Sequence, residues 1–297
     1  MRIRTLVPIL SLCLLAGVAI AKDAPGITYP ETKTVDAFDE LHGHRIEDPY
    51  RWMEDDDAEE VVKWDVAQNA VLRARLDTWS GRAPWKALMD KEFGQPGMPS
   101  APKFAGNRRF YTFRPAGKNK AILYVTSADG KAEPRVALDP NTWSEKGTAS
   151  LVDWAASPDG GMVAYRRDDM GSEETTLYFR DLVTGQDLPD AITRTKFSPL
   201  VWAPDSKGIY YSRMPDPESV PEGEAQHHRR VFFHELGTLP LDDKMVYGAK
   251  RPMLESGWIY NSSDEKHLFI NRGLPYMNTD TLELVRTGER TWRLDPI

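Results

Sequence analysis

Three stretches of the sequence repeat one turn pattern: Ser157-Pro158-Asp159-Gly160, Ala203-Pro204-Asp205-Ser206 and Ser262-Ser263-Asp264-Glu265. Proline, aspartate, serine and glycine favour tight turns, because they preset or tolerate the backbone angles of the turn. The fourth and sixth residues after each aspartate are apolar in all three copies: Val163 and Tyr165, Ile209 and Tyr211, and Leu268 and Ile270. This alternation predicts that a strand with one buried face follows each turn.

The spacing of the copies indicates an architecture. They lie roughly 45 to 60 residues apart, close to the ~40–50 residues of one four-stranded propeller blade. A weaker earlier copy runs through Asn107, Tyr111 and Phe113, and residues 176–182 are expected to be the outer strand of the second blade. At this spacing, residues 104–297 suffice for about four blades. We therefore expect a mainly β fold, an incomplete β-propeller preceded by an N-terminal arm and helix.

The region before the repeats has a different pattern. From Lys22 to about Tyr50 no period is sustained, which indicates an extended arm. A helix is predicted to begin at the acidic residues 55–60 and to end near Arg75, because these charges suit the two ends of a helix. Its apolar face is predicted to consist of Val61, Trp64, Ala67, Val71 and Ala74. A short second helix should carry Pro84 near its start. Its inner, core-facing side is predicted to consist of Trp85, Leu88, Met89 and Phe93.

The first residues have the composition of a secretory signal peptide. Arg2 and Arg4 precede an apolar run, which ends in the small-x-small pattern Ala19-Ile20-Ala21. Because the run is short for a bilayer span, we expect cleavage after Ala21 rather than an uncleaved anchor, and no stable membrane span afterwards. The predicted organisation is a signal peptide (1–21), an N-terminal arm and helical segment (22–100) and a partial propeller (101–297). A periplasmic or secreted location follows from the signal.

Composition excludes several classes of function. The chain of 297 residues has 38 Lys+Arg against 45 Asp+Glu, a net charge of −7. A binder of nucleic acid needs a basic surface to displace counterions, so no nucleic-acid partner is expected. The one cysteine, Cys13, lies in the predicted signal peptide, so the mature chain is expected to hold no thiol for catalysis or metal binding.

Other residues suggest ligand sites that the sequence favours less. The acidic run 55–60 could bind a cation, but its place at a helix start already explains it. His42 and His44, or His227, His228 and His234, could offer nitrogen ligands to zinc, yet their spacings match no metal motif. Trp154, Trp202 and Trp258 could stack on sugars, but their place before each turn favours core packing. We therefore predict no cofactor and no metal site.

A family resemblance rests on the run Asp48-Pro49-Tyr50-Arg51-Trp52 with its flanks from Tyr29-Pro30 to Asp55. It continues with Trp64 and Ala67-Gln68-Asn69, with residues 171–175 and 188–190, and with Arg230-Val231-Phe232-Phe233-His234-Glu235-Leu236-Gly237-Thr238. Together these segments resemble the N-terminal portion of prolyl oligopeptidases. The resemblance covers essentially all of the chain after the predicted signal peptide.

The resemblance implies a serine peptidase that cuts short peptides after proline, with an α/β-hydrolase domain capped by a seven-bladed propeller. The family's catalytic serine, aspartate and histidine lie in the hydrolase domain. The sequence contains no Gly-x-Ser-x-Gly elbow, so no catalytic residue is carried over onto this chain. We expect a propeller fragment that is inactive alone. Its partners would be proline-containing short peptides and a separate α/β-hydrolase chain.

Two other functions stay open from the sequence. A small exported propeller could stand alone as a binding or interaction module, although its open edges would favour aggregation. A metal-dependent hydrolase would have to use the histidines. Whether the chain itself is an enzyme is therefore left open at this stage.

Overall fold

The computed structural model describes residues 26–262, 267–274, 279–288 and 291–296. The chain divides into an N-terminal unit, Met1–Asp90, and a C-terminal unit, Lys91–Ile297. The predicted signal peptide and the predicted turn at Asp264 lie outside the described residues.

The N-terminal unit begins with a hairpin where an extended arm was expected. Strands β1 (Phe38–Leu41) and β2 (His44–Glu47) pair antiparallel, and the 3-10 helix η1 (Arg51–Met53) follows. The two turn residues His42 and Gly43 have φ of 54° and 80°, as a two-residue hairpin turn requires. The predicted extended arm thus contains a β-hairpin that the sequence analysis did not predict. His-Gly was the local signal for the turn.

Helix α1 (Glu59–Thr78) starts directly after the acidic run, as predicted, with Glu59 and Glu60 in its first turn. On its predicted apolar face Val61 is buried and Trp64, Ala67 and Val71 are half-buried, whereas Ala74 is exposed. The residues before the hairpin pack on this face. The Trp64 Nε1 donates to the Thr32 hydroxyl at 2.9 Å, and the Trp52 Nε1 donates to the Lys33 carbonyl at 3.0 Å.

Helix α2 (Arg82–Phe93) confirms the predicted second helix, with Pro84 in its first turn. Its predicted inner side, in contrast, is exposed. The exposed fractions are 56% for Trp85, 46% for Leu88, 47% for Met89 and 65% for Phe93. The helical spacing of the apolar residues therefore identified an apolar face that no described residue covers.

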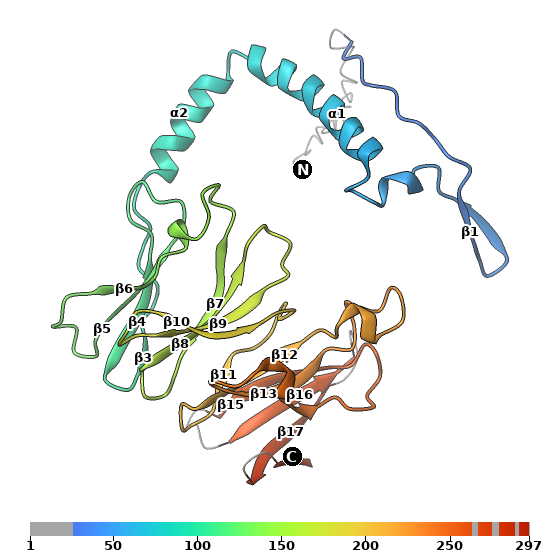
Figure 1. The fold of residues 1–297 in the computed structure, drawn as a ribbon. Helices are drawn as coiled ribbons and strands as arrows, with labels where there is room; N and C mark the ends of the chain where they lie inside the picture. Colours follow the sequence, from blue (N-terminus) through green and yellow to red (C-terminus); the bar gives the residue numbers. More distant parts are fainter. Residues whose placement is uncertain (1–25, 263–266, 275–278, 289–290, 297) are drawn as a thin grey trace, which may run out of the picture. The chain divides into compact units, whose positions relative to one another are not determined.

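The C-terminal unit contains four four-stranded sheets among its described residues (Figure 1). In each sheet the strands are antiparallel and follow the order of the chain. The strands are β3 (Lys103–Ala105), β4 (Arg108–Phe113), β5 (Ile122–Ser127) and β6 (Arg135–Leu138) in the first sheet; β7 (Ser150–Ala156), β8 (Met162–Asp168), β9 (Thr176–Asp181) and β10 (Asp187–Ile192) in the second; β11 (Val201–Trp202), β12 (Gly208–Arg213), β13 (Arg230–Glu235) and β14 (Lys244–Tyr247) in the third; β15 (Ser256–Asn261), β16 (Leu268–Gly273), β17 (Thr279–Gly288) and β18 (Thr291–Pro296) in the fourth. Short 3-10 helices, η2 (Pro140–Thr142), η3 (Pro217–Ser219) and η4 (Pro240–Asp242), lie in the connections.

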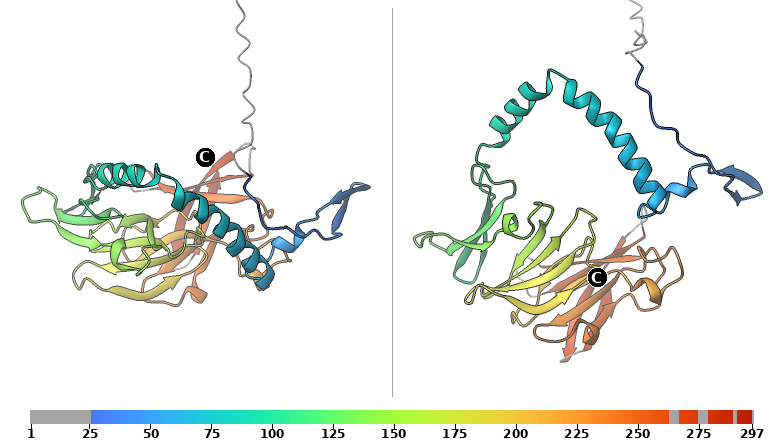
Figure 2. Two further views of the ribbon diagram at one scale, coloured as in Figure 1. Left: turned by 90° about the horizontal axis from the view of Figure 1, so that it is seen from above. Right: turned by 45° about the horizontal axis from the view of Figure 1, so that its top comes forward.

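The strands predicted to follow the three turns are confirmed. The strands after the turns are β8, β12 and β16, and all six predicted apolar residues on them are buried. In the weaker earlier copy, the predicted alignment is displaced by one residue from the buried face of the strand. Phe110 is fully buried there, while Tyr111 and Phe113 are only half-buried. Residues 176–181 form β9, the third strand, and β10 lies outside it. The mainly β class holds, and the sheets follow one another in both views of Figure 2.

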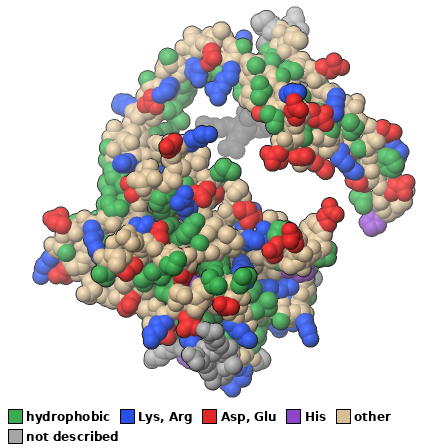
Figure 3. Space-filling model, in the orientation of Figure 1, with side chains coloured by type: hydrophobic (Ala, Val, Ile, Leu, Met, Phe, Trp, Pro, Cys, Tyr) green, Lys and Arg blue, Asp and Glu red, His purple; other side chains and the backbone are tan. Residues whose placement is uncertain are grey.

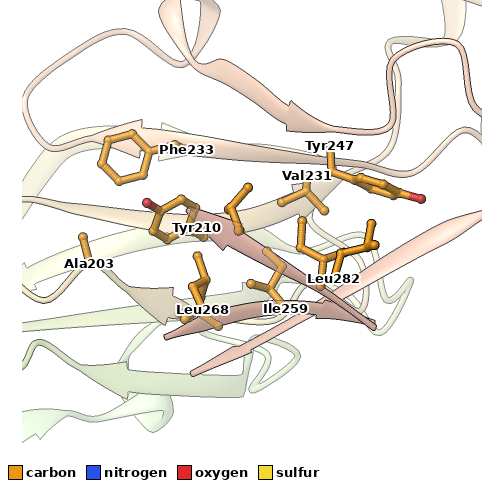
Figure 4. Packing of buried hydrophobic residues seen from close by; sticks show 11 residues of the cluster. Ala203, Tyr210, Val231, Phe233, Tyr247, Ile259, Leu268 and Leu282 are labelled. Atoms are coloured by element: carbon orange, nitrogen blue, oxygen red, sulfur yellow. The ribbon is translucent and has the colours of Figure 1, made fainter. Parts of the chain in front are cut away.

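Apolar side chains fill the space between neighbouring sheets. One cluster joins the first and second sheets around Phe110 and Trp154. Another joins the second and third around Phe179 and Tyr211. A third cluster joins the third and fourth sheets, where Val231 and Ile259 face each other from β13 and β15 (Figure 4). Burial of this area stabilises the unit by about 25 cal/mol per Å² of apolar surface.

The predicted turns also bring neighbouring sheets together. Gly160 has φ of 73°, and a Cβ on it would lie 2.5 Å from the Ala105 carbonyl oxygen of the first sheet. The Asp159 N–H donates to the Ser206 hydroxyl of the next turn at 3.1 Å. The Asp159 carboxylate accepts from the Ser157 hydroxyl and the Gly161 N–H. Asp159 is therefore a turn residue, as predicted, and so is Asp205, which accepts from the Lys207 N–H.

Candidate functional site

The inner strands of the four sheets line a cavity of about 580 Å³. Each sheet contributes residues of its first strand: β3, β7, β11 and β15. The most exposed lining side chains are aromatic, with exposed fractions of 62% for Phe104, 52% for Trp258 and 39% for Tyr260. An opening with aromatic walls can hold apolar side chains of a peptide.

Strand alternation explains why Trp258 and Tyr260 are exposed while Ile259 between them is buried. Along β15 the buried residues are Gly257 and Ile259, and the residues between them point to the opposite face. The prediction that the tryptophans fill the core is confirmed for Trp154 and Trp202, which are 9% and 4% exposed. It is wrong for Trp258. This tryptophan lies on the cavity face of its strand, so its place before the turn is not equivalent.

The cavity offers little chemistry beyond binding. Its described lining residues include one carboxylate, Asp153, and one side-chain amide, Asn261, but no serine, histidine or lysine. A hydrolytic site needs a nucleophile next to a base, or a metal-bound water. The cavity can therefore bind a ligand, and its described lining residues include no serine paired with a histidine.

A buried polar network links the second and third sheets. His234 on β13 is fully buried, with its Nδ1 at 2.7 Å from the Asp243 carboxylate and its Nε2 at 3.1 Å from the Asp190 carboxylate. The Tyr211 hydroxyl donates to Asp243 at 2.6 Å, and the Gly237 N–H donates to Asp190 at 2.6 Å. Sequence analysis placed His234 in the third blade but missed both aspartates.

The electrostatics of this network favour a charged histidine. Burial alone would lower the pKa of His234, but the hydrogen bonds and negative charges of Asp243 and Asp190 raise it overall. Burial raises the pKa of Tyr211, and the charge of Asp243 raises it further. A carboxylate, an imidazole and a hydroxyl in line resemble an acid–base relay. Because the imidazole is fully buried, no substrate reaches it, and its role is to join the two sheets.

The other histidines lie apart from this network. His42 and His44 are exposed on the hairpin of the N-terminal unit. In the C-terminal unit His228 contacts the Glu224 carboxylate at 2.5 Å in the loop before β13. Among the described residues no group of three or more His, Cys, Asp or Glu side chains is arranged to hold a metal ion. The zinc arrangement considered from the sequence is therefore not assembled in the described part of the chain.

The surface charge and the helices bear on two requirements, those of nucleic-acid binding and of a membrane span. On the face drawn in Figure 3, Lys and Arg side chains are interspersed with Asp and Glu side chains. None of the described helices is both long and apolar enough to cross a membrane.

Comparisons with known proteins agree with this architecture. Residues 29–282 match the family model for the N-terminal β-propeller domain of prolyl oligopeptidase. The chain is similar to the prolyl endopeptidase of Elizabethkingia meningoseptica, with 31% identity over 84% of this chain and 35% of the relative. It is also similar to the dual function macrocyclase-peptidase POPB of Galerina marginata, with 28% identity over 83% of this chain and 37% of the relative.

Solved structures give the same result. A prolyl endopeptidase structure superposes with a TM-score of 0.81 at 35% identity, covering 90% of this chain and 39% of that chain. The oligopeptidase B of Leishmania major superposes with a TM-score of 0.75 at 22% identity, which shows the shared fold. The chain thus spans between a third and two fifths of the length of these proteins.

Proposed function

The chain belongs to the prolyl oligopeptidase family, and we propose that it serves as the propeller portion of a serine peptidase that cleaves short peptides after proline. One observation carries the proposal: the match of residues 29–282 to the family's propeller domain. Relatives named as prolyl endopeptidases support the reaction class. The inner-strand cavity, with its aromatic walls, supports a role in admitting or holding peptides.

We propose further that the chemistry resides on an α/β-hydrolase domain and that the chain alone hydrolyses nothing. The sequence has no Gly-x-Ser-x-Gly elbow, and the described lining of the cavity has no nucleophile–base pair. His234, the best-positioned imidazole, is closed off from solvent. In this proposal the propeller selects and confines the peptide, while an activated serine elsewhere attacks the peptide carbonyl.

The helices are the proposed docking element for the hydrolase domain. Leu72 on α1 and Trp85, Leu88 and Met89 on α2 are between 46% and 56% exposed. Apolar side chains at helical spacing gain free energy when another surface covers them. A hydrolase domain, on the same or on a separate polypeptide, would supply that surface.

Export is part of the proposal. Residues 1–21 have the charge and apolar pattern of a signal peptide, and the protein would act in the periplasm or outside the cell. Intact-mass measurement on protein recovered from the periplasm of an expressing Gram-negative host tests this. The proposal expects a chain that begins at Lys22, and a full-length chain kept in the cytoplasm would contradict it.

A chimera tests the main proposal. Residues 29–282 would replace the matching segment of the Elizabethkingia meningoseptica prolyl endopeptidase, which is 31% identical. The proposal expects a soluble chimera that hydrolyses a chromogenic prolyl peptide and is blocked by a serine-directed inhibitor. A chimera that melts cooperatively but binds and cleaves no prolyl peptide would contradict the proposal. The unmodified relative is the positive control, and its variant without the catalytic serine is the negative control.

A further inference from the structure

Two arginines from neighbouring sheets are poorly paired in the C-terminal unit. Arg166 lies on β8, and its side chain is 8% exposed. Its Nη1 donates to the Thr195 carbonyl at 3.4 Å, its Nη2 lies 3.6 Å from the Asp153 carboxylate, and its buried Nε has no partner in the described chain. These contacts are long for a charged donor, whose bonds to carboxylates usually measure about 2.7–2.9 Å.

Arg229, the residue before β13, has even fewer partners. It is half-buried, its Nε is buried without an acceptor, and its guanidinium forms no hydrogen bond or ion pair with any described residue. Burial lowers the pKa of Arg229, and the nearby positive charge of Arg166 lowers it further. Arg166 contacts the Thr195 carbonyl and Arg229 lies over the ring of Phe197, so both positive charges adjoin one short, partly desolvated segment. Such an arrangement costs free energy unless an anion compensates it.

Two other half-buried arginines, Arg180 and Arg251, are each matched by a carboxylate. Arg180 forms two bonds with the Asp187 carboxylate, at 2.6 and 3.0 Å. Arg251 forms two with Glu255, at 2.7 and 2.6 Å. In both pairs one carboxylate accepts two bonds from one guanidinium. At Arg229 it supplies none among the described residues.

Arg166 and Lys196 each face a carboxylate, whereas Arg229 faces none among the described residues. Asp153 faces Arg166, and Glu173 pairs with Lys196 at 3.0 Å. Arg229 remains without a carboxylate in the described part of the chain. The free guanidinium of Arg229 can therefore take one carboxylate group, whose two oxygens suit its planar set of donors.

An aromatic ring adjoins the unmatched charge. Phe197 is 50% exposed, and its ring lies 5.8 Å from the Arg229 Cζ and 5.2 Å from the Lys196 Nζ. Its backbone is in the left-handed region, with φ of 53°, which is costly for a residue with a bulky side chain. Strain of this kind persists where the structure holds a side chain in place. In this backbone conformation the apolar ring of Phe197 stays half-exposed beside the Arg229 cation.

We propose that Arg229 and Arg166 form a binding site for a single carboxylate group, and that Phe197 packs against the apolar part of the molecule that carries it. The carboxylate could belong to an acidic peptide or to a small organic acid. The site consists of residues of this chain alone, so its test does not need a catalytic domain, and a failure would leave the proposed peptidase function untouched.

Calorimetry on the chain at low ionic strength tests the site with matched probes. The probes are N-succinyl-Ala-Ala-Phe-amide, its N-acetyl counterpart without the carboxylate, and succinate alone. We expect the succinyl peptide to bind about tenfold more tightly than the acetyl peptide, because charge-assisted bonds would be gained. Arg229→Gln should remove that difference. Arg135→Gln, at an exposed arginine on β6, is the matched control and should leave it unchanged.

Each outcome decides the proposal. Equal binding of the succinyl and acetyl peptides, or a difference that survives Arg229→Gln, would overturn it. An equal loss in Arg135→Gln would overturn it as well, because the effect would then be net charge. Tight binding of succinate alone would support the site and assign it to small acids rather than peptides.

Thermal unfolding distinguishes a binding role of Arg229 from a purely structural role. Because Arg229 is unpaired and repelled by Arg166 in the free protein, Arg229→Gln should leave the Tm unchanged or raise it. The succinyl peptide should raise the Tm of the wild type and not that of the variant. A clear fall in the Tm of the free variant would mean that Arg229 holds the fold, and would contradict the proposal.

Discussion

The helical segment and the sheets of this chain differ in how much apolar surface they bury by themselves. Among the described residues before Phe110, Val61 is the one hydrophobic side chain that is buried. From Phe110 onward each sheet shares a buried cluster with a neighbour. The sheets therefore contain their own source of stability, whereas the helices carry an apolar face without a described cover. An apolar period in a sequence indicates that a face can be buried, but it does not indicate by which surface.

The largest expected effect tests this contrast with two phenylalanines. Phe179 is fully buried between the second and third sheets, where its ring lies near Trp202 and His234. Phe179→Ala should lower the free energy of unfolding by about 3–5 kcal/mol, through lost burial and a cavity. Phe93→Ala, at a residue of α2 that is 65% exposed, should change it by less than about 0.5 kcal/mol. Urea unfolding measures both, and similar losses in the two variants would show that the comparison is wrong.

A second prediction concerns the turns that join the sheets. Gly160→Ala should cost about 2–3 kcal/mol, because the left-handed backbone is strained for alanine and the added Cβ would meet the Ala105 carbonyl. Gly185 has nearly the same φ, 72° against 73°, but nothing lies within 4 Å of its added Cβ. Gly185→Ala should therefore cost only about 1 kcal/mol. Thermal unfolding measures both losses of stability. Equal losses in the two variants would show that the close approach of Gly160 to Ala105 contributes nothing to the free energy of unfolding.

The network around His234 predicts how stability depends on pH. Protonated His234 can donate to Asp190 and to Asp243 at once, with Tyr211 also bonded to Asp243. The two carboxylates raise the pKa of His234 above its ordinary value of about 6.5, although burial opposes them. The folded state then holds a proton that the unfolded state has released. Stability from this network is complete below about pH 6.5 and is lost as the pH rises through the folded pKa.

Urea unfolding between pH 6 and pH 9 checks this prediction. The wild type should lose stability as the pH rises, and His234→Gln should lose that dependence along with part of its stability. His44→Gln, at an exposed histidine of the hairpin, should keep the wild-type profile. A stability that rises with pH in the wild type would contradict the assignment of a doubly bonded imidazolium.

The smallest expected effect lies in the N-terminal unit. Trp64→Phe removes the bond from the indole nitrogen to the Thr32 hydroxyl, which is worth about 1 kcal/mol. Because the sheets hold their own core, the Tm of the main transition should not move. Limited proteolysis should instead cut faster near residues 27–36, relative to a Trp79→Phe control at the residue that follows the same helix. A shift of the main transition would show that the two regions are more tightly coupled than their burial indicates.

The β repeats were predictable because strand alternation and turn chemistry are local. The residues four and six positions after Asp159 and Asp205 could be placed in the core from spacing alone, and they are buried. The earlier copy lacks the Pro-Asp turn, so the alignment slipped by one residue and missed Phe110. The outer strand β10 was missed because it carries Pro189 and charged residues, which read as a connection. An edge strand needs only one partner, so its sequence is less constrained.

The polar sites were less predictable, because they join residues far apart in sequence. Asp190 and His234 meet across two sheets, and no local pattern relates them. Arg166 and Arg229 likewise come from different sheets, and a lone arginine in a sequence shows no sign of lacking a partner. What the sequence did contain was the family resemblance, which the comparisons confirm over residues 29–282.

We propose that this chain supplies the propeller of a prolyl oligopeptidase and none of its chemistry. Hydrolysis of a chromogenic prolyl peptide by the purified chain tests it most directly, with a serine-directed inhibitor and a chelator in parallel. The account predicts no turnover above the uncatalysed rate, by a chain that still melts cooperatively. Turnover that the inhibitor abolishes would contradict it, because the sequence would then hold a nucleophile outside the family's pattern. Turnover that the chelator abolishes would contradict it as well, by placing a metal site on this chain.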